Sequence, residues 1–391
     1  MTGDRGALSL PWADGIEPSS LLVSDFNELL LWAFDSGISD LSFGSDEPPI
    51  ALIESEYVRI GHRVLTTQEI NSIIATIYGE HGPARLAGSE SLDFAYEVVR
   101  GRGERARFRV NATTGRTEQT AYGVELSLRT IPEVPPSMAD LGIELEIIQA
   151  HREVAMTQGL VLTVGATGTG KSTLQASLMR DVLEQRPGRK LLTYEAPIEY
   201  VLSRVPNKVG MVVQAEVGRH VRSFADGVSN AMRRKPHVIL IGEAREIETV
   251  TGVIEAALTG HAVYATMHAG SVASAVPRLV TMFPPSEHRS VTARLLDVLR
   301  LIVTQRLVPR VGGGRIALRE YLKFDEDLRV ELAFATVERL QGLIHTAVKE
   351  QGRSMLADAV EKNVAGLISD ETLEIIRAEW ESKRTTGQQK G

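Results

Sequence analysis

The fold is decided by residues 160–173, which read Leu160-Val161-Leu162-Thr163-Val164-Gly165-Ala166-Thr167-Gly168-Thr169-Gly170-Lys171-Ser172-Thr173. The first part is a short apolar run, which is typical of a β-strand buried on both faces. The part from Gly165 to Thr173 satisfies the pattern G-x-x-x-x-G-K-[ST], and apolar residues at helical spacing follow it, namely Leu174, Leu178 and Met179. A strand, a glycine-rich loop and a helix in this order predict a phosphate-binding loop.

The residue types in this loop suit a bound nucleotide. Glycines let the backbone curl so that successive N–H groups point at phosphate oxygens, and the start of a helix adds partial positive charge there. Lys171 can neutralise the β- and γ-phosphates, and the Ser172 hydroxyl can bind Mg²⁺. We therefore expect Gly165–Thr173 to bind ATP. The alternative, a chance glycine-rich turn, does not account for the lysine, the serine and both flanking elements.

Hydrolysis also requires a carboxylate near Mg²⁺. The apolar run Val238–Ile241 predicts a buried strand, and Glu243 follows it closely. Ligands of α/β proteins bind at the carboxyl edge of the parallel sheet, where this strand would deliver Glu243. We therefore expect Glu243 to act in catalysis and to bind the metal together with Ser172.

A further group must orient or activate the attacking water. The apolar run Leu191–Tyr194 predicts another strand, and Glu195 and Glu199 follow it. We assign the role to Glu195, with Glu199 as the second candidate. The alternative is that both are surface carboxylates after a strand.

Two histidines bracket a fourth apolar strand, Ala262–Met267. His268 would emerge at the same sheet edge as Glu243 and could sense the γ-phosphate, and His261 is a weaker candidate for a nucleotide role. The alternative is that each is an ordinary structural histidine. A zinc site is not expected, because an extended segment holds the two rings at opposite ends.

Upstream, the sequence predicts a small α+β domain. Ser24 can cap a helix with Phe26, Leu29, Leu30 and Phe34 on one side, and Thr66 and Glu69 have capping-box spacing ahead of Ile70, Ile73, Ile74 and Ile77. Strand-like alternation follows over residues 92–128. Arginines cluster within it, at Arg100, Arg102, Arg105, Arg107 and Arg109. They form either the solvated face of a strand pair or a surface for an anionic partner.

Composition narrows the function classes. The chain has 391 residues, enough for roughly two or three domains. It carries 43 Lys and Arg against 50 Asp and Glu, so the chain as a whole is not a basic nucleic-acid binder. The absence of cysteine excludes disulfides, thiolate zinc sites and iron–sulfur clusters. No apolar run is long enough to span a membrane and no secretory signal opens the chain, so we expect a cytoplasmic protein.

Taken together, these motifs resemble the secretion-ATPase superfamily, which includes the PilT-type pilus retraction motors, the GspE-type type II secretion ATPases and the conjugation ATPases. The matching segments are Gly165–Thr173 for Walker A, Thr193–Tyr200 for the Asp box, Gly242–Arg245 for Walker B and Gly260–His268 for the His box, with Phe283–Pro285, Thr304–Leu307, Arg107–Asn111 and Arg129–Pro132. Within the family, Asn230–Pro236 and Val308–Arg315 resemble the DotB and TraJ ATPases of type IVB secretion and conjugation. Ala196 departs from the pattern, which has aspartate there.

The resemblance implies an α/β fold with a RecA-like P-loop NTPase domain and a smaller α+β, PAS-like N-terminal domain. It implies a homo-hexamer that hydrolyses ATP with Mg²⁺, recruited by an inner-membrane secretion complex and coupling proteins to the cytoplasmic face of that membrane. No sequence-specific nucleic-acid binding is expected. The family's arginine fingers carry over to Arg107, Arg109 and Arg129, with Arg233 and Arg245 as further candidates from the C-terminal domain.

The sequence pattern also sets the domain limits. We expect a flexible N-terminus over 1–20, the PAS-like domain over 21–131, a proline-rich linker over 132–138, the ATPase domain with C-terminal helices over 139–380, and a disordered tail over 381–391. The linker prediction depends on Pro132, Pro135 and Pro136, which cannot continue a helix.

Other functions remain open at this point. A PilT-like pilus retraction motor would use the same chemistry for a different task. A DNA translocase should show basic channel loops studded with aromatic residues, whereas only Phe224 accompanies the basic residues Arg219, His220, Arg222, Arg233, Arg234 and Lys235. A small-molecule kinase would need a lid and an acceptor pocket, and a non-hydrolysing switch would leave Glu195 and Glu243 without a task.

Overall fold

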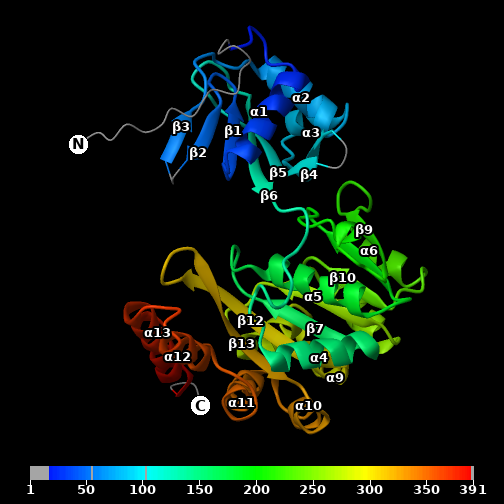
Figure 1. Cartoon of the computed structure of the whole chain (residues 1–391). Helices are drawn as coiled ribbons and strands as arrows, with labels where there is room; N and C mark the ends of the chain where they lie inside the picture. Colours follow the sequence, from blue (N-terminus) through cyan, green and yellow to red (C-terminus); the bar gives the residue numbers. More distant parts are fainter. Residues whose placement is uncertain (1–16, 54–55, 102–103, 389–391) are drawn as a thin grey trace. The chain divides into compact units, whose positions relative to one another are not determined.

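The chain forms two compact units (Figure 1). The computed structural model describes residues 17–53, 56–101 and 104–388. The first unit holds the described residues up to Glu133 together with Ala196–Tyr200, and the second holds the remainder. Each unit has its own sheet and its own apolar core, so each is described separately.

The start of the chain was expected to be flexible over 1–20, and residues 1–16 of it lie outside the described residues. Glu17 is described. Its carboxylate accepts hydrogen bonds from the backbone N–H groups of His62, at 2.9 Å, and Arg63, at 3.1 Å. Residue 17 is therefore held against the first unit by two backbone donors.

The first unit is a six-stranded antiparallel sheet packed with helices. Its strand order is β3-β2-β1-β6-β5-β4. The elements are α1 (Val23–Asp35), β1 (Asp40–Gly44), β2 (Ile50–Ile53), β3 (Glu56–Arg59), α2 (Thr67–Ile77), α3 (Gly82–Ala87), β4 (Leu92–Arg100), β5 (Glu104–Gly115) and β6 (Gly123–Ile131). Thr66 and Glu69 form the capping box that the sequence predicts, and the isoleucines behind it are buried.

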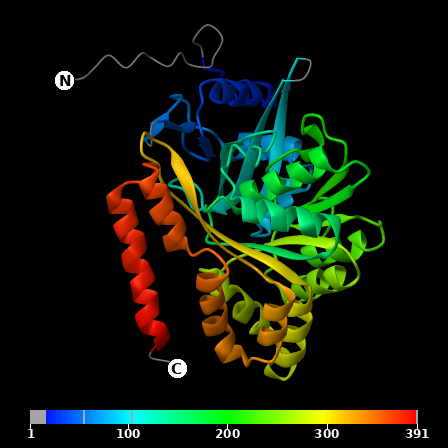
Figure 2. The same ribbon diagram turned by 60° about the horizontal axis from the view of Figure 1, so that its bottom comes forward.

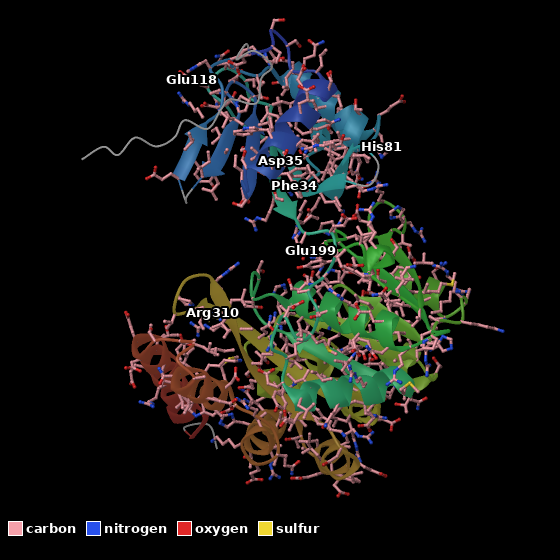
Figure 3. The ribbon with its side chains drawn as sticks, viewed as in Figure 1. Phe34, Asp35, His81, Glu118, Glu199 and Arg310 are labelled. Atoms are coloured by element: carbon pink, nitrogen blue, oxygen red, sulfur yellow. The ribbon has the colours of Figure 1, made fainter. Side chains whose placement is uncertain are left out.

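Two residues of α1 differ from the sequence prediction. Ser24 was expected to cap the helix, but the helix begins at Val23 with Leu22 as its N-cap, because the Asp25 carboxylate accepts the Leu22 N–H at 2.9 Å. Phe34 was expected on the apolar side of the helix, but its side chain is 40% exposed (Figure 3). Seven residues after Phe26, close to two full helical turns, the chain reaches Ala33, which is fully buried. Phe34 lies a further 100° around the helix, away from the core.

The second unit is built on a seven-stranded sheet with the order β13-β12-β7-β11-β10-β8-β9. All neighbours are parallel except β13, which is antiparallel to β12. The strands are β7 (Gly159–Val164), β8 (Lys190–Glu195), β9 (Met211–Glu216), β10 (Val238–Ile241), β11 (Ala262–Met267), β12 (Leu299–Pro309) and β13 (Arg315–Lys323). Strands β7, β10 and β11 are buried at every position, as their unbroken apolar runs predict.

Helices cover both faces of this sheet. They are α4 (Leu145–Met156), α5 (Lys171–Gln185), α6 (Phe224–Ala231), α7 (Ile247–Leu258), α8 (Val272–Val280) and α9 (His288–Val298). Alternate residues of β11 serve different cores: Val263 and Ala265 pack with residues of α6–α9, whereas Tyr264 packs with residues of α4 and α5. This is the doubly covered parallel sheet of a RecA-like domain.

The chain ends in helices α10 (Glu326–Ala333), α11 (Val337–Glu350), α12 (Met355–Val364) and α13 (Asp370–Gln388). Helices α12 and α13 pack against the hairpin of β12 and β13 through Val308, Leu318, Ala359 and Ile376 (Figure 2). The tail expected to be disordered over 381–391 is helical up to Gln388, and residues 389–391 lie outside the described part. Polar composition favoured a tail, but residues 381–386 contain neither glycine nor proline to end the helix.

Candidate active site

The glycine-rich loop joins the end of β7 to the start of α5. Gly165 has φ +150° and Gly170 has φ +83°, and residues that carry a side chain rarely adopt these backbone conformations. A Cβ on Gly165 would lie 2.8 Å from the Gln305 carbonyl oxygen, and one on Gly170 would lie 2.7 Å from Gln305 Nε2. The glycines are therefore required by both backbone conformation and space, and they bring the loop against β12.

The lysine of this loop closes it on itself. Lys171 Nζ donates hydrogen bonds to the carbonyl oxygens of Gly165, at 2.9 Å, and Ala166, at 2.7 Å. Thr169 Oγ1 also donates to the Ala166 oxygen, at 2.9 Å. Ser172 is exposed in the first turn of α5. The ammonium, the helix N-terminus and a hydroxyl thus lie together, and this combination suits phosphate and Mg²⁺.

Glu243 and His268 meet at the carboxyl edge of the sheet. Glu243 follows β10, His268 follows β11, and His268 Nε2 lies 3.3 Å from Glu243 Oε1. Thr266 fixes the turn after β10 with two hydrogen bonds. Its hydroxyl donates to the Gly242 carbonyl oxygen, and its backbone carbonyl accepts from the Ala244 N–H at 2.8 Å. His268 follows β11, the direct neighbour of β7, and Glu243 follows β10, one strand further along the same edge from the strand that carries the loop.

Glu195 ends the next strand along that edge, β8. Its Oε1 accepts hydrogen bonds from the Thr193 hydroxyl and from Gln214 Nε2, the latter at 3.0 Å. Gln214 is anchored in turn, because its Oε1 accepts the Leu202 N–H at 2.8 Å. The carboxylate is therefore oriented by its neighbours and only partly buried. A phosphate-binding loop, a carboxylate after β10 and an oriented carboxylate after β8 now share one edge.

Comparison with known proteins agrees with this arrangement. Residues 99–390 match the model of the family described as "Type II/IV secretion system protein". The chain belongs to this family. It is 34% identical over 298 residues to the type IV pilus retraction ATPase PilT of Pseudomonas aeruginosa. The aligned region covers 76% of this chain and 82% of that protein.

Solved structures of DotB and PilT resemble most of the chain. The ATPase DotB of Legionella pneumophila has a TM-score of 0.86 and 38% identity, covering 93% of this chain and 98% of that one. The pilus retraction motor PilT with bound ADP has a TM-score of 0.76 and 30% identity, covering 89% of this chain and 95% of that one. These matches confirm the α/β class predicted from the sequence, a RecA-like P-loop domain with an N-terminal domain.

The arginines predicted to act as fingers lie in the first unit of this family member. Arg107 is buried, and its guanidinium donates to the carbonyl oxygens of Glu199, at 2.7 Å, and Ile198, at 3.0 Å. Arg109 makes two hydrogen bonds to Asp93, at 2.6 and 3.1 Å, and its NH1 lies 3.5 Å from Glu199 Oε1. Glu199, the second candidate for orienting water, is labelled in Figure 3. It contacts both arginines within the first unit, through its carbonyl oxygen and its carboxylate.

Arg129 lies directly across from Arg109 in the β5–β6 ladder. Its Nε donates to Asp40 Oδ1 at 2.8 Å, and its side chain is 69% exposed. The alternative from sequence was a solvated face formed by Arg100, Arg102, Arg105, Arg107 and Arg109. It does not describe Arg107, which is buried, and Arg102 lies outside the described residues.

The remaining candidates divide between the two edges of the second sheet. Arg245 joins the carboxyl edge, with NH1 3.6 Å from Glu243 Oε2. Arg233 follows α6 on the amino side of β10 and donates to the Ser229 carbonyl at 2.9 Å. His261 precedes β11, and its Nδ1 lies 2.9 Å from the Ala256 oxygen. A nucleotide role for His261 is therefore not supported, because a six-residue strand spans about 20 Å.

The donor set at this edge fits Mg²⁺. Within residues 17–53, 56–101 and 104–388, no group of three His, Asp or Glu side chains is placed to hold a metal by protein ligands alone. Mg²⁺ instead binds through one or two protein oxygens together with substrate phosphates and water. The Ser172 hydroxyl and the Glu243 carboxylate are hard oxygen donors of that kind. In the same described residues, no helix is both long enough and apolar enough to cross a membrane.

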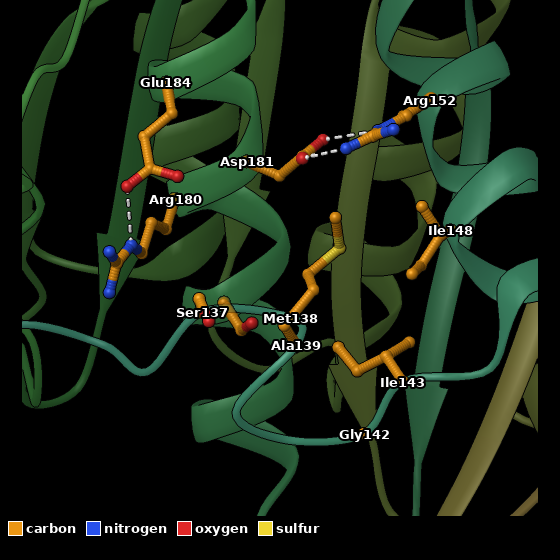
Figure 4. Close-up of a pocket in the computed structure, with 11 residues that line it drawn as sticks. Ser137, Met138, Ala139, Gly142, Ile143, Ile148, Arg152, Arg180, Asp181 and Glu184 are labelled. Carbon is orange, nitrogen blue, oxygen red and sulfur yellow. Dashed lines mark hydrogen bonds and ion pairs between the residues drawn. The ribbon is translucent and has the colours of Figure 1, made fainter.

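A cavity of about 270 Å³ lies between α4, α5 and the segment 137–143 (Figure 4). None of the predicted site residues lines it. On its wall Asp181 accepts two hydrogen bonds from Arg152, at 2.6 and 3.1 Å, and lies 3.4 Å from the buried His151 ring. Burial alone would raise the pKa of Asp181, but these two partners lower it to about 2. We read this group as a stabilising ion cluster.

Sequence reasoning missed Gln305, which touches the phosphate-binding loop. Its Nε2 donates to the Thr169 carbonyl oxygen at 2.8 Å. The residue lies in Thr304–Leu307, a segment that resembles the family, yet nothing in the local pattern gives it a task. A contact across 136 positions leaves no spacing signal in the sequence.

Proposed function

We propose that this chain is a hexameric ATPase that hydrolyses ATP to power export or assembly in a secretion or conjugation system of type IVB. The likeness to Legionella DotB supports this most, because it spans 93% of the chain and therefore includes both units. Asn230–Pro236 and Val308–Arg315, which resemble that group of ATPases, support it independently of the overall fold.

Each side chain of the site has a task in this proposal. Lys171 and the N-terminus of α5 bind the phosphates of ATP, and Ser172 and Glu243 hold Mg²⁺. Magnesium, when bound, neutralises charge on the phosphates. Glu195 polarises the attacking water, since Thr193 and Gln214 hold its carboxylate in place. His268, at hydrogen-bonding distance from Glu243, responds to the γ-phosphate.

The ring supplies what one subunit lacks. Charge that develops on the γ-phosphate requires more cation than Lys171 alone, and an arginine at such a site accelerates hydrolysis by about 10³–10⁵ in other P-loop enzymes. We propose that at least one of Arg107, Arg109 and Arg129 completes the site of an adjacent subunit. The ring then works at the cytoplasmic face of the inner membrane, recruited by a secretion complex and coupling proteins.

A second candidate is a pilus retraction motor. The 34% identity with Pseudomonas PilT over 76% of the chain favours it, and the site chemistry is shared. The two candidates differ in partner, so the genes beside this one separate them. Coupling-protein and secretion-complex genes support the first proposal, and pilin genes support the second.

Phosphate release by the purified full-length chain tests the shared part. Activity should require Mg²⁺, should rise per chain with protein concentration as rings assemble, and should disappear in Lys171→Ala. Sedimentation over the same concentrations should show the hexamer appear together with the activity. A chain that forms hexamers but releases no phosphate from Mg·ATP would refute the ATPase assignment.

A further inference from the structure

A buried glutamine connects the phosphate-binding loop to a buried arginine. Gln305 lies on β12, which pairs with β7, and its side chain is almost wholly buried. Its Nε2 donates to the Thr169 carbonyl oxygen, and its Oε1 accepts from Arg319 Nε, both at 2.8 Å. A side-chain amide can donate and accept in this way at the same time. A glutamate could not donate to Thr169, and a lysine could not accept from Arg319.

Arg319 lies on β13 and is 1% exposed. Its NH1 donates to the Gly142 carbonyl oxygen at 3.0 Å and to Glu144 Oε2 at 3.1 Å, and its NH2 donates to the Leu141 carbonyl oxygen at 3.0 Å. The buried charge is thus compensated by the Glu144 carboxylate. The arginine joins the segment before α4, part of which lines the cavity in Figure 4, to the same glutamine.

The connection continues to the C-terminal helices. The Arg319 N–H donates to Asp358 Oδ2 of α12 at 2.8 Å. Lys362, one turn later, donates to the same oxygen at 2.6 Å and to Glu144 Oε1 at 3.2 Å. One hydrogen-bonded network therefore runs from Thr169 in the loop to α12.

We propose that Gln305 and Arg319 are positioning residues for the nucleotide site. They hold the Thr169 carbonyl in place, and this fixes the phosphate-binding loop. Through the same hydrogen bonds, they couple the position of α12 to the position of that loop. The contact at Gly170 supports this, because a Cβ there would lie 2.7 Å from Gln305 Nε2. The expected effect on ATP binding rests on the proposed function. The hydrogen bonds of Gln305 to Thr169 and Arg319 can be tested without nucleotide.

The variant Gln305→Glu separates positioning from packing. The glutamate has nearly the same size and still accepts from Arg319, but its carboxylate faces the Thr169 carbonyl without a proton to donate. We expect hydrogen–deuterium exchange of peptides covering 165–171 to rise in the full chain without nucleotide. The Kd for ATP should weaken by about tenfold or more, the equivalent of roughly 1.4 kcal/mol, and kcat should change less than KM.

Arg306→Gln is the matched control. Arg306 is the next residue on β12, and its ion pair with Glu379 is exposed. Loop exchange and ATP affinity should equal those of the wild type. Gln305→Asn serves as a second test if the glutamate variant folds poorly, because the shorter amide cannot span both partners and carries no charge.

Unchanged loop exchange in both Gln305 variants would overturn the proposal, whatever the nucleotide measurements show. Raised loop exchange with unchanged ATP affinity would overturn the positioning role. A wild-type chain that binds ATP without hydrolysing it would refute the proposed function and leave the exchange and affinity results on Gln305 valid.

Discussion

Gly168 and Gly170 form a natural pair for testing the geometry of the phosphate-binding loop. Their φ angles are nearly equal, +77° and +83°. A Cβ on Gly168 would meet nothing within 4 Å, whereas one on Gly170 would lie 2.7 Å from Gln305 Nε2. Alanine at either position therefore carries the same backbone strain, about 1–2 kcal/mol. Alanine at Gly170 must also displace the Gln305 amide.

The additional cost follows from the bonds that the amide makes. Displacing it breaks the hydrogen bonds to Thr169 and Arg319, at about 1 kcal/mol each when buried. Gly170→Ala should therefore lower the free energy of unfolding by about 3–4 kcal/mol, and Gly168→Ala by about 1–2 kcal/mol. Urea unfolding of the nucleotide-free chain, followed by far-UV circular dichroism, measures both.

A double-mutant cycle locates the cause. In a Gln305→Ala background the colliding atom is gone, so the cost of Gly170→Ala should fall to that of Gly168→Ala. Equal costs for the two alanines in the wild-type background would refute the reasoning. So would a Gly170→Ala cost that Gln305→Ala does not reduce.

Three further predictions follow from the site and the ion cluster. Glu243→Gln should bind ATP yet release phosphate far more slowly, and Glu195→Gln should do the same. If Glu195→Gln keeps wild-type turnover while Glu199→Gln loses it, then Glu199 is the carboxylate that orients the water. Mixing Lys171→Ala with the triple alanine variant of Arg107, Arg109 and Arg129 should restore part of the ATPase activity, and two variants that stay inactive in demonstrably mixed rings would contradict action in trans. Asp181→Asn should lower the free energy of unfolding at pH 7 by about 2 kcal/mol, because a pKa of about 2 replaces an ordinary 3.8 on folding. This deficit should shrink as the pH falls from about 5 toward 2. A deficit that does not shrink over this range in urea titrations would exclude the carboxylate charge as its cause.

The sequence predicts those parts of the site that are contiguous in the chain. Strand, loop and helix around Lys171 stand in one motif, and Glu243 and His268 follow apolar runs long enough to be recognised as buried strands. Their common edge then follows from the parallel arrangement, without knowledge of the strand order. The same argument places His261, which precedes β11, at the opposite edge of the sheet from His268.

Contacts between distant segments were not predictable. Gln305 and Thr169 are 136 positions apart, and Arg319 and Gly142 are 177 apart. Neither pair has a period or a motif, so each becomes visible only when β12 and β13 are placed beside β7. Phe34 illustrates the same limit on a smaller scale, since a rotation of one residue on a helix decides between core and solvent.

The three N-terminal arginines differ in what their release would cost, and this decides which is best suited to act on a neighbour. Arg107 is buried and bonded to two backbone carbonyls that would lose a charged donor, at about 1.5–3 kcal/mol each. Arg109 would give up a two-point contact with Asp93. Within the part of the chain that the structure describes, the Arg129 side chain pairs only with Asp40, in an exposed ion pair of a kind worth about 0–1 kcal/mol. If the arginines act in trans as proposed, a γ-phosphate in an adjacent subunit should displace that carboxylate most easily. The single variant Arg129→Ala should then reproduce most of the defect of the triple variant.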